Sequence, residues 1–154
     1  SYTLGGTGAF MMSIPLIWNL RFAVDPLLQK ETGSDFVKIA NEADITAEPQ
    51  SIKFEKHVVD GWYESNQVQE AWVFRDEASG EIVALSPVCK HLGCTVNWNS
   101  SQQYPNEFFC PCHGAHYTKL GKNLAVAPEP LDEYEVRVEN GAVYLGGIRP
   151  NTRV

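Results

Sequence analysis

All four cysteines of this chain and two of its four histidines lie in two short segments, residues 89–94 and 110–114. The first segment reads Cys-Lys-His-Leu-Gly-Cys, the second reads Cys-Pro-Cys-His-Gly, and residues 95–109 separate them. Thiolate and imidazole groups are ligands of transition metals, and two loops that each offer both can bind a metal centre with mixed ligation. The pattern C-x-H-x-x-C followed by C-x-C-H therefore predicts a metal site formed by both segments.

A structural zinc site is the first alternative, because cysteine and histidine at short spacings also suit tetrahedral zinc. Zinc ribbons and fingers favour two to four residues between paired ligands, whereas C-x-H and C-x-C leave only one. The six candidate ligands also exceed the four that one structural zinc takes. A structural zinc-binding module is thus an alternative that the spacing disfavours.

The pattern is similar to that of Rieske iron–sulfur proteins, in which two cysteines bind one iron of a [2Fe–2S] cluster and two histidines bind the other. The second cysteine in each segment makes the chain resemble the Rieske subunit of cytochrome bc-type quinol–cytochrome c reductases. The run 89–98 resembles most closely the menaquinol-oxidising complexes of Gram-positive bacteria. Spacing alone does not tell which cysteine of each segment is a ligand.

The resemblance implies a role for each of the six side chains and one [2Fe–2S] Rieske cluster as the cofactor. It implies that the ligands are Cys89 and Cys110 on one iron and His91 and His113 on the other. It also implies that the second cysteines, Cys94 and Cys112, form a disulfide that joins the two loops.

Histidine ligation suits an electron carrier that works with quinol. Neutral imidazoles in place of two thiolates make the centre less negative, and its potential rises to roughly −150 to +300 mV, against about −400 mV for plant-type ferredoxins. The resemblance implies the electron-transfer subunit of an oxidoreductase that oxidises quinol, here menaquinol, bound in a cytochrome b subunit and reduces a c-type cytochrome. It further implies that His113 bonds the quinol and that His91 is a second exposed imidazole. The small Rieske subunit of an arsenite-oxidase-like enzyme is an alternative within the same redox class.

Three further residues are expected to bind or tune the cluster. Tyr117 occupies the position where higher-potential members carry a tyrosine that bonds a ligand cysteine sulfur. Ala115 lies where many members have a serine that bonds a bridging sulfide, and alanine cannot donate that bond. Pro128 belongs to residues 125–130, which resemble the proline-containing loop over the cluster, although Ala125-Val126 replace its usual leading Gly-Pro. His116 is expected to face solvent, and His57 to lie on a strand face without a metal role.

The rest of the chain has the patterns of a mainly β protein. Alternating apolar residues predict strands at 36–39 and 52–55, with a short helical turn near 43–46 between them. Hairpins are predicted for 71–74 with 82–85 and for 134–138 with 142–145, where Asn140-Gly141 forms the second turn. This layout matches a Rieske-type β-sandwich over residues 36–154, with a cluster-binding subdomain inserted at about 86–130.

An apolar segment precedes this domain. Leu4–Leu20 is a run of seventeen residues without a charged side chain, which as a helix would cover roughly 26 Å of a bilayer core about 30 Å thick. We expect one N-terminal transmembrane helix within an anchor at residues 1–28, although a buried core helix is the alternative. The polar residues 29–35 are expected to form a flexible linker.

Charge and the implied disulfide indicate the compartment and the partners. A formal net charge of −7 disfavours nucleic acid as a partner. A disulfide persists in oxidising compartments. We therefore expect a single-pass protein of the cell membrane, with its globular domain on the extracytoplasmic side.

Overall fold

The computed structural model describes residues 19–21, 24, 36–60 and 63–154. The expected anchor at 1–28 and linker at 29–35 lie almost wholly outside this part, with helical backbone described only at 19–21 and at 24. No helix within the described residues is long and apolar enough to cross a membrane. The chain divides into two units, Ser1–Ser34 and Asp35–Val154, of which the second carries the features below.

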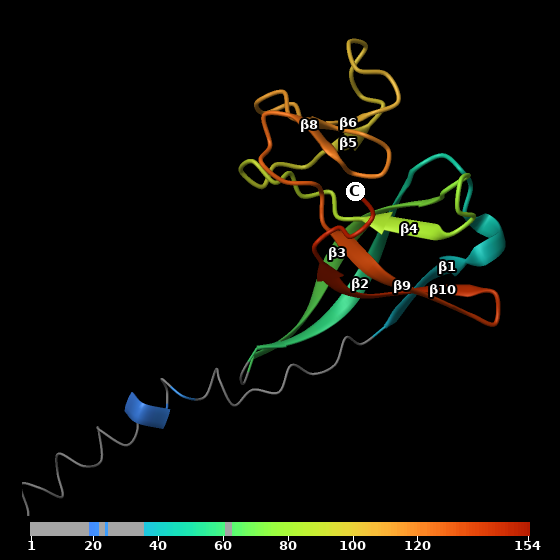
Figure 1. Cartoon of the computed structure of the whole chain (residues 1–154). Coiled ribbons are helices and arrows are strands. Elements are labelled where there is room, and N and C mark those ends of the chain that lie inside the picture. The colour runs from blue at the N-terminus through green and yellow to red at the C-terminus, as the bar shows by residue number, and fades with distance from the viewer. Residues whose placement is uncertain (1–18, 22–23, 25–35, 61–62) are drawn as a thin grey trace, which may run out of the picture. The chain divides into compact units, whose positions relative to one another are not determined.

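A six-stranded antiparallel sheet forms the base of this unit, in the order β1-β10-β9-β4-β3-β2 (Figure 1). Its strands are β1 (Val37–Asn41), β2 (Gln50–Asp60), β3 (Tyr63–Arg75), β4 (Ile82–Leu85), β9 (Glu133–Glu139) and β10 (Ala142–Arg149). A single 3₁₀ turn, Glu42–Asp44, follows β1. The predicted strands and both predicted hairpins are confirmed, and the fold is mainly β.

The two hairpin turns have local chemical causes. In the β9–β10 turn, Asn140 and Gly141 have φ of 51° and 72°, the left-handed conformations that a two-residue hairpin loop requires. In the β3–β4 turn, the Asp76 carboxylate accepts bonds from the backbone N–H of Ser79 at 3.0 Å and from its hydroxyl at 2.7 Å. These bonds hold the pKa of Asp76 below its usual range.

The base sheet consists of two three-stranded halves, β1-β10-β9 and β4-β3-β2. Within the described residues the halves are paired only at Leu85 and Glu133, while β1 also contacts β2 on the other side. The sheet therefore rolls around an apolar core that includes Phe54, Val73 and Leu145.

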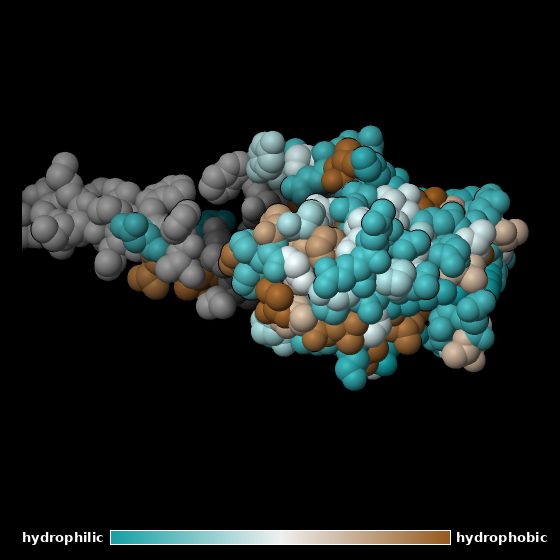
Figure 2. All heavy atoms as spheres, turned by 90° about the horizontal axis from the view of Figure 1, so that it is seen from above, coloured by the Kyte–Doolittle hydropathy of each residue, from teal (hydrophilic) through white to brown (hydrophobic). Residues whose placement is uncertain are grey.

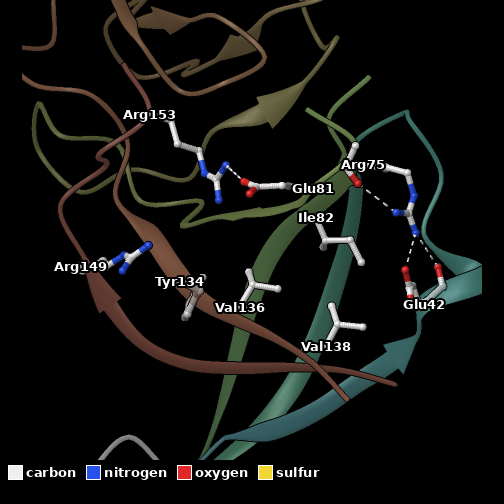
Figure 3. A pocket seen from close by; sticks show the side chains of 10 residues that line it. Glu42, Arg75, Glu81, Ile82, Tyr134, Val136, Val138, Arg149 and Arg153 are labelled. Atoms are coloured by element: carbon white, nitrogen blue, oxygen red, sulfur yellow. Dashed lines mark hydrogen bonds and ion pairs between the residues drawn. The ribbon is translucent and has the colours of Figure 1, made fainter. Parts of the chain in front are cut away.

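A cavity of about 290 Å³ is lined by residues of both halves (Figure 3). Apolar side chains from β4 and β9, among them Ile82 and Val136, form part of its wall. Its three arginines each contact a carboxylate: Arg75 lies 3.3 Å from Glu42, Arg149 2.9 Å from Glu133, and Arg153 2.8 Å from Glu81. The positive charges of this cavity are thus paired within the chain.

A second, smaller sheet comes between β4 and β9 in the sequence. It has the order β5-β6-β7-β8, with β5 (Asn97–Trp98), β6 (Phe108–Phe109), β7 (His116–Tyr117) and β8 (Asn123–Ala125). Phe108 and Tyr117 are fully buried on its inner face. They belong to one core cluster with Phe74, Val83 and Leu85 of the base, so the small sheet is packed firmly on β3 and β4.

Tryptophans support this contact between the two sheets. The Trp72 indole N–H donates to the backbone carbonyl of Val96 at 3.1 Å, and the Trp98 indole N–H donates to the Glu48 carboxylate at 3.0 Å. Both rings are partly buried against the core cluster.

The C-terminal residues are held by one buried carboxylate. Glu133 has a side chain that is 2% exposed, and it accepts bonds from Arg149 Nε at 2.9 Å, Thr152 Oγ1 at 3.0 Å and Arg153 Nε at 3.0 Å. Asn151, between these residues, donates to the Leu120 carbonyl of the small sheet's β7–β8 loop at 2.8 Å. The C-terminal segment therefore ties the small sheet to the base.

We expect Glu133→Gln to lower the free energy of unfolding by about 1.5–3 kcal/mol, the usual contribution of hydrogen bonds to a charged group. Urea unfolding of the holo-protein, followed by far-UV circular dichroism, measures this loss. Glu139→Gln on the same strand is the matched control, because Glu139 is exposed and its ion pair with Arg137 is 3.6 Å long. It should change stability by less than about 0.5 kcal/mol. Equal urea midpoints for the two variants would contradict a structural role for Glu133.

Candidate metal centre

The two cysteine–histidine segments form loops with the same backbone closure. In the first loop Cys89 N–H donates to Cys94 C=O at 2.8 Å, and Gly93 N–H donates to Cys89 C=O at 2.9 Å. The second loop repeats these bonds from Cys110 N–H to Ala115 C=O at 2.8 Å and from Gly114 N–H to Cys110 C=O at 3.1 Å. Each loop is therefore one tight turn that starts at its first cysteine.

Glycine is required at the end of each turn. Gly93 and Gly114 have φ of 78° and 75°, in the left-handed region where a Cβ atom is strained. Each glycine lies four residues after the first cysteine of its loop. This shared spacing is the sequence feature that produces the two similar turns.

A disulfide between Cys94 and Cys112 joins the two loops, with the Cα atoms 6.6 Å apart. Cys89 and Cys110 are free thiols, and both are buried. The expected disulfide pairing is confirmed, which leaves one free cysteine in each loop. The Cys110 sulfur also lies within 4.8 Å of the Cys94 and Cys112 sulfurs, but those two are bonded to each other and cannot act as thiolate ligands.

The two loop histidines lie together. The ring centroids of His91 and His113 are 4.8 Å apart, and the rings are nearly perpendicular at 85°. The Nδ1 atom of His91 is buried and has no hydrogen-bond partner among the described residues. Leaving a buried polar atom unsatisfied costs about 1–3 kcal/mol, and a metal ion would remove that cost. His113 is exposed to solvent.

The free thiols are surrounded by hydrogen-bond donors. Burial would raise the pKa of the Cys89 thiol, but bonds from the Tyr117 hydroxyl and from the backbone N–H groups of its own loop lower it below the ordinary value. Burial raises the pKa of the Cys110 thiol, although backbone N–H groups of its loop partly oppose this effect. N–H groups directed at sulfur favour negative charge there, as thiolate ligands require. This donor set fits a cluster bound by two cysteines and two histidines.

Tyr117 contacts the first loop. Its hydroxyl lies 3.1 Å from Cys89 Sγ and accepts a hydrogen bond from the backbone N–H of Lys90 at 3.1 Å. Burial raises the pKa of Tyr117 well above its ordinary value. The hydroxyl therefore keeps its proton, and it can donate that proton to the cysteine sulfur.

Ala115 and Pro128 have different surroundings. Ala115 is fully buried in the second loop, and its methyl group offers no hydrogen-bond donor. Pro128 is exposed, whereas its neighbour Ala127 is buried in the core cluster. Before them the chain makes a tight turn, in which Ala127 N–H donates to Ala125 C=O at 2.8 Å and Val126 has a φ of 67°. This left-handed conformation is rare for a β-branched residue, and it lies where the family's Gly-Pro is missing.

Sequence reasoning did not identify the partners of Lys90, the residue between two predicted ligands. The Lys90 ammonium lies 3.0 Å from both carboxylate oxygens of Asp132 and 3.5 Å from Glu129 Oε2. These bonds, the one to Asp132 first, raise the pKa of Lys90. The position of a lysine inside the ligand motif could have suggested a role at the site. Nothing in the sequence, however, pairs it with a carboxylate 42 residues away.

The prediction for His116 is wrong. Its side chain is 14% exposed, and its Nδ1 atom lies 2.7 Å from Glu107 Oε2. Its ring stacks on Tyr104 with a centroid distance of 4.0 Å. Neighbouring residues of strand β7 face opposite sides of the sheet, so Tyr117 points inward and His116 points to the other face, where Glu107 and Tyr104 cover it.

His57 lies half-exposed on β2, with Nδ1 3.0 Å from Asn66 Oδ1.

Comparison with known proteins agrees with this chemistry. The family model of the Rieske [2Fe-2S] domain matches residues 37–135. The menaquinol:cytochrome c reductase iron-sulfur subunit of Geobacillus thermodenitrificans is 51% identical over 152 residues, which cover 97% of this chain and 89% of that protein. The subunit of the same name from Bacillus subtilis (strain 168) is 49% identical over 152 residues, which cover 97% of this chain and 90% of that protein. The crystal structure of a cyanobacterial plasma membrane Rieske protein from Synechocystis PCC 6803 is 28% identical, with a TM-score of 0.53 over 72% of this chain and 99% of that one.

We expect the double variant Cys94→Ser with Cys112→Ser to keep its cluster but to release it faster. A crosslink across 18 residues stabilises a folded protein by about 3 kcal/mol in the chain-entropy model. Loss of the visible circular dichroism of the cluster in urea measures the release rate. An unchanged rate would show that the crosslink does not brace the loops. Complete absence of cluster from freshly purified protein would show that these cysteines are ligands instead.

Proposed function

The chain belongs to the Rieske [2Fe–2S] family, and from this premise we propose that it is the iron–sulfur subunit of a menaquinol:cytochrome c reductase. Relatives with that name share about half of its residues over 97% of its length. This identity favours a quinol-oxidising complex over the arsenite-oxidase-like alternative. The observation that carries the proposal is the buried Nδ1 of His91, which has no hydrogen-bond partner among the described residues, beside His113 and in loops that each hold one free buried thiol.

The proposed ligands are Cys89 and Cys110 for one iron, and His91 and His113 for the other. The disulfide between Cys94 and Cys112 supports this assignment, because sulfurs bonded to each other cannot act as thiolate ligands. When bound, a [2Fe–2S] cluster supplies a one-electron carrier whose histidine ligation raises its potential. Both proposed thiolate ligands are buried while His113 is exposed, so the imidazole side of the site is the side that a substrate can approach.

His113 has the properties of the residue that meets quinol. A ligating imidazole has a second ring nitrogen, which can accept a hydrogen bond from a quinol hydroxyl and then its proton. Since His113 is exposed, its ring can reach a quinol bound in another subunit. His91 is less exposed and is proposed as the second imidazole of the site. The free ring nitrogen of His113 would thus accept one proton while one electron leaves the quinol.

The loops around the site present apolar side chains that suit a protein partner. Leu92 in the first loop is 69% exposed, and Val126 in the turn before Pro128 is 52% exposed. Figure 2 views the molecule from above and shows hydrophobic groups scattered in a mainly hydrophilic surface. Leu92 directly follows His91 in the sequence, so a partner that approaches the imidazoles also meets this exposed apolar side chain. We propose that this end docks on a cytochrome b subunit and, in turn, on a c-type cytochrome.

The proposed location follows from the disulfide and from the relatives. A disulfide persists in oxidising compartments, which supports a globular unit on the extracytoplasmic side of the cell membrane. The proposed attachment is the single-pass anchor at residues 1–28, joined through residues 29–35 to the Rieske domain at 36–154. The apolar run Leu4–Leu20 supports this attachment.

Metal and sulfide analysis tests the proposed cofactor. We expect two irons and two acid-labile sulfides per chain, without stoichiometric zinc, and loss of the cluster when any proposed ligand is replaced by alanine. His116→Ala is the matched control, since His116 bonds Glu107 and follows the second loop, and it should retain both irons. One zinc and no sulfide in the unmodified protein would overturn the proposal in favour of a structural zinc module.

The hydrogen bond from Tyr117 should raise the midpoint potential. A charge-assisted hydrogen bond contributes about 1.5–3 kcal/mol, and it is stronger when the cluster carries the extra electron. Tyr117→Phe should therefore lower the potential by some tens of millivolts, while Ala115→Ser, which adds a donor, should raise it by a similar amount.

Redox titration by EPR measures both potentials. Tyr104→Phe is the control. Tyr104 stacks on His116, which lies three residues after His113, and within the described residues its hydroxyl makes no hydrogen bond to a proposed ligand. Its midpoint should equal that of the unmodified protein. Unchanged midpoints in Tyr117→Phe and Ala115→Ser would show that hydrogen bonding does not control the potential.

A further inference from the structure

The Lys90 side chain connects three segments of the site. Its ammonium bonds both oxygens of Asp132 at 3.0 Å and lies 3.5 Å from Glu129 Oε2. Lys90 belongs to the first ligand loop, Glu129 follows Pro128 in the proline-containing loop, and Asp132 directly precedes β9. The Lys90 side chain is 25% exposed and that of Asp132 is 27% exposed, so this ion pair is partly shielded from water.

Asp132 is itself fixed to the base sheet. Its backbone carbonyl accepts a hydrogen bond from Ser86 N–H at 2.8 Å, next to the Leu85–Glu133 pair that joins the two halves of the base. The carboxylate that holds Lys90 therefore projects from a rigid part of the fold. Through it, the middle of the first loop is anchored to the base.

The backbone of Lys90 takes part in the same site. Its N–H donates to the Tyr117 hydroxyl at 3.1 Å, and that hydroxyl lies 3.1 Å from Cys89 Sγ. Fixing the side chain of Lys90 also fixes this N–H group. The orientation of the tyrosine toward the cysteine sulfur therefore depends on the position of Lys90.

Charge is the second property of this cluster of side chains. One ammonium stands beside two carboxylates, so the group carries a net charge of about −1 close to the proposed ligands. Lys90 is the covalent neighbour of both Cys89 and His91. Lys90 and Asp132 are partly shielded from water, whereas the Glu129 side chain is 67% exposed. Partly shielded charges are screened less than exposed ones, so the charges of Lys90 and Asp132 act most strongly on an electron added nearby.

We propose that Lys90 is a positioning residue: its ion pair with Asp132 holds the first ligand loop on the base, its contact with Glu129 adds the proline-containing loop, and its charge favours the reduced state of the cluster. This proposal rests on the proposed function. It assigns a role to a side chain that binds no metal.

The test compares Lys90→Met with Asp132→Asn in the holo-protein. Both changes weaken the ion pair, so both should speed release of the cluster to an iron chelator at least about threefold. The midpoint potentials should move in opposite directions, because Lys90→Met removes a positive charge and Asp132→Asn removes a negative one. We expect about a threefold change in the reduction equilibrium constant each way, or about 28 mV at 59 mV per tenfold change.

Three further variants sharpen the result. Lys90→Arg keeps the charge and the donors and should restore the potential and most of the slow release. The double variant Lys90→Met with Asp132→Asn should release its cluster no faster than the faster single variant, since both changes break one contact. Lys122→Met removes an exposed lysine in the β7–β8 loop and should change the release rate by less than a factor of two.

Potential shifts of the same sign in Lys90→Met and Asp132→Asn would overturn the charge role, and unchanged release rates would overturn the positioning role. Failure of the proposed function is distinguishable from both, because the unmodified protein would then contain no [2Fe–2S] cluster. In either failure of the Lys90 proposal, the unmodified protein would still contain its cluster.

Discussion

One covalent bond, the disulfide between Cys94 and Cys112, brings together two loops that belong to different strand connections. Each loop is a tight turn that begins at a free cysteine and closes at a left-handed glycine. Without the crosslink, the two loops would be held together only through the small sheet and its core. With it, two loops that each hold a buried thiol and an imidazole are joined, and no group in the described part of the chain bonds the buried Nδ1 of His91.

The rest of the domain keeps this convergence rigid. The core cluster under the loops includes residues of β3 and β4 as well as the small sheet, so loop and base are parts of one packed unit. Side-chain bonds add to this packing: Lys90 to Asp132, Trp98 to Glu48, and Asn151 to the Leu120 carbonyl. A cluster site of this kind needs rigidity, because its potential depends on hydrogen bonds and charges that must not change position between oxidised and reduced states.

Features that depend on residues close together in the sequence could be predicted, whereas contacts between distant residues could not. The β9–β10 hairpin was predictable because Asn140-Gly141 requires a specific turn. The two candidate metal loops could be located because their cysteines and histidines lie at short local spacings. The strands β5 to β7 have two residues each, too few for any periodicity, so no pattern could predict their order. The Lys90–Asp132 pair spans 42 residues, and the burial of His116 depends on Tyr104 and Glu107 across the small sheet. Such contacts are created by tertiary packing alone.

The disulfide pairing was expected from family resemblance, whereas spacing left two choices in each loop. The central claim is that one iron has two cysteine ligands and the other two histidine ligands, His91 and His113. Pulsed EPR of the reduced holo-protein measures this directly, since nitrogen bound to iron couples to the unpaired electron. We expect couplings from two histidine nitrogens that disappear on uniform ¹⁵N labelling and are replaced by those of the heavier isotope. A cluster signal without nitrogen ligand couplings would contradict this ligation.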